Sequence, residues 1–170
     1  MAPIRFRSRH LHATLVEHLR VQLDQRGWIT PPINFDEDPA TVLDYQPDER
    51  GVAINANTVA ISLGDFEADE DEELGARFPG GLRSASYPVF IDVYMAKQAL
   101  SVSICDDIRD IYQDLTVPLV DQLTGTQVPG AMIEIAAIIG PERPPAATGA
   151  ENFRRYWRVM RMAADLYYNT

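Results

Sequence analysis

Three histidines near the start of the chain are the residues best suited by type to bind a transition metal or to act as a base. His10, His12 and His18 are separated by two and six residues. On a helix these separations place neighbouring side chains about 200° and about 240° apart, whereas helical zinc ligands converge at spacings such as i, i+4. We therefore predict no metal site, and we expect the histidines to face solvent or a contact surface.

A run of carboxylates from Asp65 to Glu73 alternates much like the first ligands of a calcium-binding loop. Counted from Asp65, however, the sixth position is Glu70, where such a loop needs glycine, and the twelfth is Ala76, where it needs glutamate. A solvated acidic loop is the better prediction. Its candidate role is in channel or stacking contacts, made by Asp65, Glu67, Asp69, Glu70, Asp71, Glu72 and Glu73.

Nucleophilic and acid-base chemistry have no clear candidates either. The single cysteine, Cys105, lies on the apolar stripe of a predicted helix, so we expect a buried, reduced thiol. Asp106 and Asp107 are adjacent and therefore project from different parts of that helix, and we expect both to face solvent. Phosphate-binding loops, dinucleotide fingerprints, GxSxG, HExxH and CxxC are all missing from the sequence. We predict a protein that is not an enzyme, with no catalytic residues, no metal ligands and no cofactor.

Arginines gather in two segments of a chain whose formal net charge is -10. Such segregation suits subunits that stack with a positive patch against a negative one, and the net acidity argues against general affinity for nucleic acid. The candidate subunit or partner contacts are Arg5, Arg7, Arg9, Arg154, Arg155, Arg158 and Arg161.

Two stretches have the hydrophobic period of amphipathic helices. In the first, leucines recur every fourth residue from Leu11 to Leu23, with Ser8 as a candidate N-cap and Gly27 as the stop. In the second, apolar residues recur from Leu100 to Leu115. This second helix directly follows a strand predicted from the alternation over 89–95, and the two can pack against each other.

Other segments favour strands at 52–63 and 131–139. The stretch 153–168 is ambiguous, because its local pattern slightly favours a helix while the strand at 131–139 needs an antiparallel neighbour. We predict a long strand there. Between these elements we expect a basic arm at 1–9, a long acidic loop at 64–86 and a proline-rich loop at 140–150.

The fold class that follows is α+β, a mostly antiparallel sheet of about four main strands with two amphipathic helices packed on one face. With 170 residues and 46% hydrophobic content, the chain fits a single globular domain. It contains neither a signal-peptide pattern nor an apolar run long enough to cross a membrane.

The order of these elements, with the patterns PVFIDVYMA, ALSVSICDDIRDI and RRYWRVMRMAADLYY, resembles the tail terminator proteins of long-tailed bacteriophages with non-contractile tails. The resemblance spans about residues 11–168. It implies a hexameric ring on the head-proximal end of the tail tube, which stops tube polymerisation and joins the tail to the neck below the head. The implied partners are other copies of this chain, the tail tube protein and a neck or head-completion protein.

The same resemblance implies a structural virion protein that is assembled in the bacterial cytoplasm and located in the tail. DNA would pass through the ring without sequence-specific binding, and the family supplies no catalytic residues. Two alternatives remain open. One is another neck component, such as a head-closure or tail-completion protein. The other is a small α+β enzyme or ligand-binding domain whose site combines residues such as His18, Tyr94 and Asp107.

Overall fold

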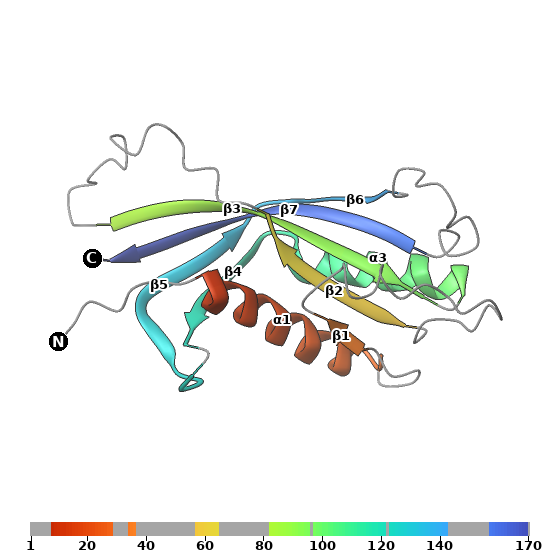
Figure 1. The fold of residues 1–170 in the computed structure, drawn as a ribbon, viewed down its shortest axis with the longest axis horizontal. Coiled ribbons are helices and arrows are strands. Elements are labelled where there is room, and N and C mark those ends of the chain that lie inside the picture. The colour runs from red at the N-terminus through yellow and green to blue at the C-terminus, as the bar shows by residue number, and fades with distance from the viewer. Residues whose placement is uncertain are drawn as a thin grey trace, which may run out of the picture.

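A curved sheet with two helices on one of its faces makes up the described part of the chain (Figure 1). The computed structural model describes residues 8–28, 34–36, 57–64, 82–95, 97–121, 123–142 and 157–169. The helices are α1 (Ser8–Gln25) and α3 (Gln98–Tyr112). The strands are β1 (Asn34–Asp36), β2 (Thr58–Leu63), β3 (Leu82–Tyr94), β4 (Leu115–Val120), β5 (Gln127–Ile135), β6 (Ile138–Glu142) and β7 (Trp157–Asn169).

The predicted α+β class and the placement of both helices on one face are confirmed, but the sheet has more strands than predicted. Its order is β1-β2-β3-β7-β5-β4, with β6 also paired to β7. Every pairing is antiparallel except that of β1 with β2. Because β7 contacts β3 along one side and β5 and β6 along the other, it joins the two halves of the sheet.

The pairing of β3 with β7 runs unbroken over thirteen positions, from Leu82 opposite Asn169 to Tyr94 opposite Trp157. The prediction of a strand for the last segment is confirmed over 157–168. Alternation along these strands sends Ile91 and Met160 to the helix-covered face, where both are fully buried. The neighbouring residues Phe90 and Arg161 point to the opposite face.

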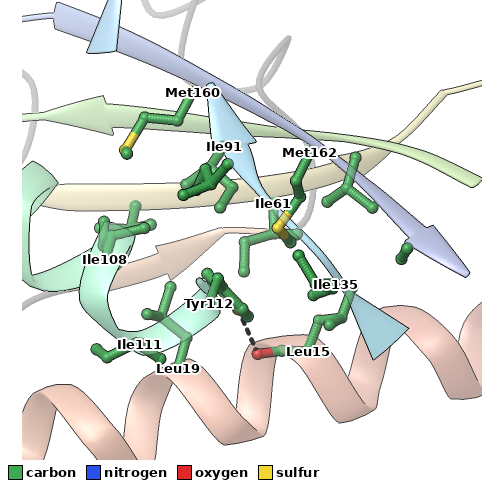
Figure 2. Close-up of a cluster of buried hydrophobic side chains, with 14 of the residues drawn as sticks. Leu15, Leu19, Ile61, Ile91, Ile108, Ile111, Tyr112, Ile135, Met160 and Met162 are labelled. Atoms are coloured by element: carbon green, nitrogen blue, oxygen red, sulfur yellow. Dashed lines mark hydrogen bonds between the residues drawn. The ribbon is translucent and has the colours of Figure 1, made fainter. Parts of the chain in front are cut away.

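The helices bury their apolar stripes against this sheet, as the spacing predicts. The leucines of α1, from Leu11 to Leu23, are at most 1% exposed, and Ile104 and Ile108 of α3 are fully buried. Figure 2 shows Tyr112 pointing from the end of α3 toward α1, where its hydroxyl donates a 2.7 Å hydrogen bond to the carbonyl oxygen of Leu15.

Both helices end at turns with positive φ. After α1, Gly27 has a φ of 86°, and the amide of Trp28 donates to the Leu23 carbonyl, which closes the helix as predicted. After α3, Asp114 has a φ of 53°. The prediction that this helix extends to Leu115 is therefore wrong, because the turn at Asp114 places Leu115 at the start of β4.

Several other boundaries differ from the prediction. The strand β4 was not predicted, although an edge strand tolerates a proline such as Pro118 when the nitrogen faces away from its neighbour. The predicted strand at 131–139 is two strands, β5 and β6, with a break at 136–137, and β6 extends to Glu142, into the predicted proline-rich loop. Residues 82–86 of the predicted acidic loop belong to β3, and residues 8–9 of the predicted arm belong to α1.

Close packing explains why β6 reaches past Gly140. A Cβ atom at this position would lie 2.8 Å from the carbonyl oxygen of Val159, so only glycine allows β6 to approach β7 this closely. The Gly140 carbonyl also accepts a hydrogen bond from Nη2 of Arg109, which attaches α3 to the same strand.

Candidate interaction surfaces

Most of the predicted contact residues lie outside the described residues. These are the acidic positions from Asp65 to Glu73, together with Arg5, Arg7, Arg154 and Arg155. Arg9 belongs to the first turn of α1. The remaining two, Arg158 and Arg161, are both on β7, and because they are an odd number of residues apart they project from opposite faces of the sheet.

Arg158 lies on the helix-covered face and is only 7% exposed. It is paired with Val93 in the sheet, and its Nη1 donates a 2.8 Å hydrogen bond to the carbonyl oxygen of Trp157. A guanidinium in this position is not part of the outer surface of the subunit. β7 therefore turns this side chain inward, and the partner contact expected of Arg158 stays a prediction.

Arg161 lies on the helix-free face and is exposed, and its role as a contact stays a prediction. It forms an ion pair with Glu142 of β6. Its partner in β6, Ile139, is 64% exposed. Farther along the same face, Met132 of β5, which is paired with Tyr167, is 37% exposed. Among the described residues, this face therefore combines exposed apolar side chains with a paired charge, the composition that protein interfaces use.

An aromatic cluster lies at one end of the same face. Asp92 accepts a 2.8 Å hydrogen bond from Nε1 of Trp157, and the indole stacks on Tyr94 with ring centroids 5.4 Å apart. Asp92 is 7% exposed, and its burial raises the pKa of the carboxyl. Burial likewise raises the pKa of the Tyr94 phenol, whose hydroxyl has no hydrogen-bond partner among the described residues. The cluster fixes the end of the β3–β7 pair.

The histidines attach α1 to three different places instead of forming one site. His10 is 4% exposed, with Nδ1 3.8 Å from the carboxylate of Asp121, so the expectation of a solvent-facing side chain is wrong for this residue. Nε2 of His12 lies 2.6 Å from the Ile61 carbonyl oxygen, and it must carry a proton to donate there. Within the described part of the chain, no three potential ligands gather into a metal site.

His18 is half-buried, with its ring centroid 6.3 Å from that of Tyr112. Burial lowers the pKa of this imidazole, which favours the neutral form. His18 lies on α1 and Asp107 on α3, while Tyr94 is on the helix-free face of the sheet. The described structure therefore does not assemble these three residues into the site suggested for an enzyme.

The expectation that Asp107 faces solvent is wrong. Its carboxylate accepts a 2.6 Å hydrogen bond from Nε1 of Trp28 and a 2.8 Å bond from Nη1 of Arg26, and so connects the end of α1 to α3. The neighbouring Asp106 is exposed and pairs with Arg109. Asp107 thus joins α1 to α3, whereas Asp106 forms an ion pair on the surface of α3.

Cys105 is fully buried, as predicted, and free. Burial raises the pKa of its thiol to about 11. Since the thiolate is the nucleophilic form of cysteine, the raised pKa disfavours a nucleophilic role for this side chain at neutral pH.

A groove between α1 and the edge strand β4 is a further surface, and sequence reasoning missed it because β4 was not predicted. Its volume is about 470 Å³. The lining residues are mostly apolar or small, with two carboxylates: Ala13, Thr14, Glu17, His18, Val21, Val117, Pro118, Val120, Asp121 and Gly125. The clue in the sequence was the apolar run at 115–120, interrupted by a proline that an edge strand accepts.

No described helix combines the length and the apolar character needed to cross a membrane. In comparisons with known proteins, no family model and no curated protein sequence matches the chain.

Proposed function

We propose that this protein is a structural component of a phage tail, the subunit of a hexameric ring that caps the head-proximal end of the tail tube. The proposal starts from the resemblance in element order. The described elements follow the expected sequence of a helix, a strand, the unit in which β3 leads into α3, and further strands that end in β7. The ring would stop tube polymerisation and join the tail to the neck, which places the protein in the virion.

The observation that best supports a ring subunit is the helix-free face of the sheet. Both helices cover the opposite face, so Ile139 remains exposed beside the Arg161–Glu142 ion pair, and Met132 remains exposed farther along the same face, opposite Tyr167. A subunit within a stack needs such surfaces for neighbours, because each copy contacts partners on more than one side. The aliphatic residues supply apolar contact area, and the charged pair supplies orientation.

The charge of the chain also supports a conduit through which DNA passes. With a formal net charge of -10, the chain repels phosphates overall, and tight phosphate contacts would hold back a moving genome. In this proposal, the acidic segment from Asp65 to Glu73 borders the channel or meets a basic neighbour in the stack. Replacing residues 69–73 by serine should impair ring formation or tail joining, and unchanged assembly would refute this role.

The direct test is the mass of the purified protein in solution, measured by light scattering after size exclusion, alone and with tail tube protein. We expect the 19.0 kDa chain to form a closed ring, alone or when tube ends are supplied. A protein that stays monomeric and ignores tube ends at all concentrations would refute the proposal. Binding only to portal-side proteins would instead identify another neck component.

A matched pair of variants tests the surface. Ile139→Glu places a charge on the helix-free face, whereas Val102→Glu places one on the outer side of α3, where Val102 is 47% exposed. Both substitutions are at exposed positions, so both variants should fold. We expect only Ile139→Glu to reduce assembly, and equal effects of the two would argue against the helix-free face as the contact.

A further inference from the structure

The first half of β3 has an edge with which no described strand pairs. β2 pairs with β3 only from Val89 to Tyr94, whereas β3 begins at Leu82. Figure 1 shows β3 extending beyond the end of β2, with β7 running along its other side. Over residues 82–87, one edge of β3 is therefore filled by β7, and the other edge is open among the described residues.

Pro88 explains where the pairing with β2 ends and which groups face outward. Its carbonyl oxygen accepts a 2.7 Å hydrogen bond from the amide of Gly64, so the backbone groups of Pro88 face the β2 side. Proline has no amide hydrogen with which to return this bond, so the ladder cannot continue in its usual form. Because backbone groups of alternate residues face the same edge, the open amides and carbonyls belong to Leu82, Ser84 and Ser86.

Other edges of the described sheet are short, or they lack amides that could pair with a further strand. β1 has only three residues. On β4, Pro118 has no amide hydrogen, and the amide of Val120 already donates a 3.1 Å hydrogen bond to Oγ1 of Thr14. The part of β5 that extends past β7 contains Pro129. An open edge that keeps its amides, as over 82–86, is a template for pairing with another chain.

The same edge of a second copy is a matching partner. Two identical strands can pair antiparallel around a twofold axis, so that the same patch meets itself. With the axis at Ser84, Leu82 lies opposite Ser86 of the second copy, and every open amide and carbonyl of these residues is used. The one charged residue of the segment 82–86 is Arg83, which then lies opposite Ala85, so no like charges face each other directly.

We propose that two copies of the free protein associate through residues 82–86 of β3, so that their two sheets become one continuous sheet. The register follows from the hydrogen bonds. A shift by two residues toward β2 would place Leu82 opposite Pro88, which has no amide hydrogen and whose carbonyl is already bonded to Gly64. Pairing around Ser84 is therefore the register that uses the described edge most fully.

This contact goes beyond the proposed function and does not depend on it. A twofold contact cannot join neighbouring subunits of a ring whose two sides differ, as the two sides of a tail cap must. The dimer therefore belongs to the free protein, and ring formation would exchange it for other contacts. Covering the open edge in this way would also protect it from pairing with unrelated chains before assembly.

Two single-cysteine variants of the full-length chain test the contact and its register. In Ser84→Cys the two introduced residues of a dimer are directly opposite, and the Cα atoms of such a hydrogen-bonded pair are about 5.5 Å apart, a distance that a disulfide spans. In Ser86→Cys the two introduced residues are four positions out of register, about 13 Å along the strands. The native Cys105 is fully buried and stays in both variants.

After oxidation, we expect Ser84→Cys to yield about tenfold more covalent dimer than Ser86→Cys, because only the first pair of Cα atoms lies within about 7 Å. The dimer has a mass of about 38 kDa, twice 19.0 kDa. A mixture of Leu82→Cys and Ser86→Cys should cross-link more than either variant alone, since these positions are opposite. Equal yields from Ser84→Cys and Ser86→Cys, or no dimer from either, would overturn the proposal.

Light scattering of the wild type and Ser84→Pro provides a second readout. The substitution removes an amide hydrogen that faces away from β7, so it leaves the β3–β7 hydrogen bonds in place. With unchanged circular dichroism, the apparent mass of the wild type should rise with concentration above 19.0 kDa, and that of Ser84→Pro should not. A wild type that stays monomeric at every concentration, or association that Ser84→Pro leaves unchanged, would contradict the dimer. No tail protein is used, so this result is separate from the test of the ring.

Discussion

The hydroxyl of Tyr112 is one of the groups through which α3 holds α1, and its removal should have a measurable and limited effect on stability. Tyr112 is fully buried, and its hydroxyl donates to the Leu15 carbonyl over 2.7 Å. Tyr112→Phe removes this one hydrogen bond and keeps the ring packed. A buried neutral hydrogen bond contributes about 1 kcal/mol net. The Leu15 carbonyl keeps its bond within the helix, so the loss should stay below about 2 kcal/mol.

The assay is thermal and urea unfolding of the wild type and two variants. For a domain of this size, about 1 kcal/mol corresponds to a fall in Tm of about 2–4 °C. Tyr94→Phe is the matched control, because the Tyr94 hydroxyl is buried and has no partner among the described residues, so its loss should be neutral or slightly stabilising. If both variants lost the same stability, or if Tyr112→Phe lost none, the α1–α3 hydrogen bond would not carry the assigned energy.

Three further substitutions test the described contacts. Burial raises the pKa of Asp92, so the folded state disfavours the carboxylate, and the stability from this group is present below pH 3.8 and lost as the pH rises through the raised pKa. Asp92→Asn should therefore be more stable than the wild type at neutral pH, and the difference in urea midpoint should vanish in acid. Burial lowers the pKa of His18, so its contribution is present above pH 6.5 and lost as the pH falls through the lowered value. His18→Gln should lose less stability than the wild type between about pH 7 and about pH 5, and identical pH profiles would contradict the burial of His18. Asp107→Ala should lower the free energy of unfolding by about 1 kcal/mol, because it breaks the bonds to Trp28 and Arg26, whereas Asp106→Ala should change it little. If chemical denaturation showed that Asp107→Ala and Asp106→Ala lower the free energy of unfolding equally, the bonds of Asp107 would not stabilise the α1–α3 contact as assigned.

Hydrophobic periodicity was a reliable guide wherever one helix face or one strand face is buried. The leucines of α1 and the isoleucines of α3 face the core as their spacing predicts. The end of α3 was misplaced for a simple reason. Leu115 continues the apolar stripe but belongs to β4, because Asp114 takes a left-handed conformation that aspartate tolerates better than most residues.

Sheet contacts decided the features that local patterns could not. Over 157–168 the local pattern slightly favours a helix, yet β7 pairs along its full length with β3 and is a strand. The same pairing carries Arg158 into the interior. From the sequence alone we expected it to be exposed, because most arginines are. The α1–β4 groove depends on elements about a hundred residues apart in the chain, so the apolar run at 115–120 could predict β4 but not its position beside α1.

The central position of β7 has a consequence for synthesis. A ribosome makes the chain from its N-terminus, so β7 is the last of the described elements to emerge, yet it joins β3 to β5 and β6. Until residues 157–169 leave the exit tunnel, the long edge of β3 has no partner on that side, and such unpaired edges invite association with other nascent chains. The two halves of the sheet can unite only in one late step, which leaves the newly made chain vulnerable until β7 has left the tunnel.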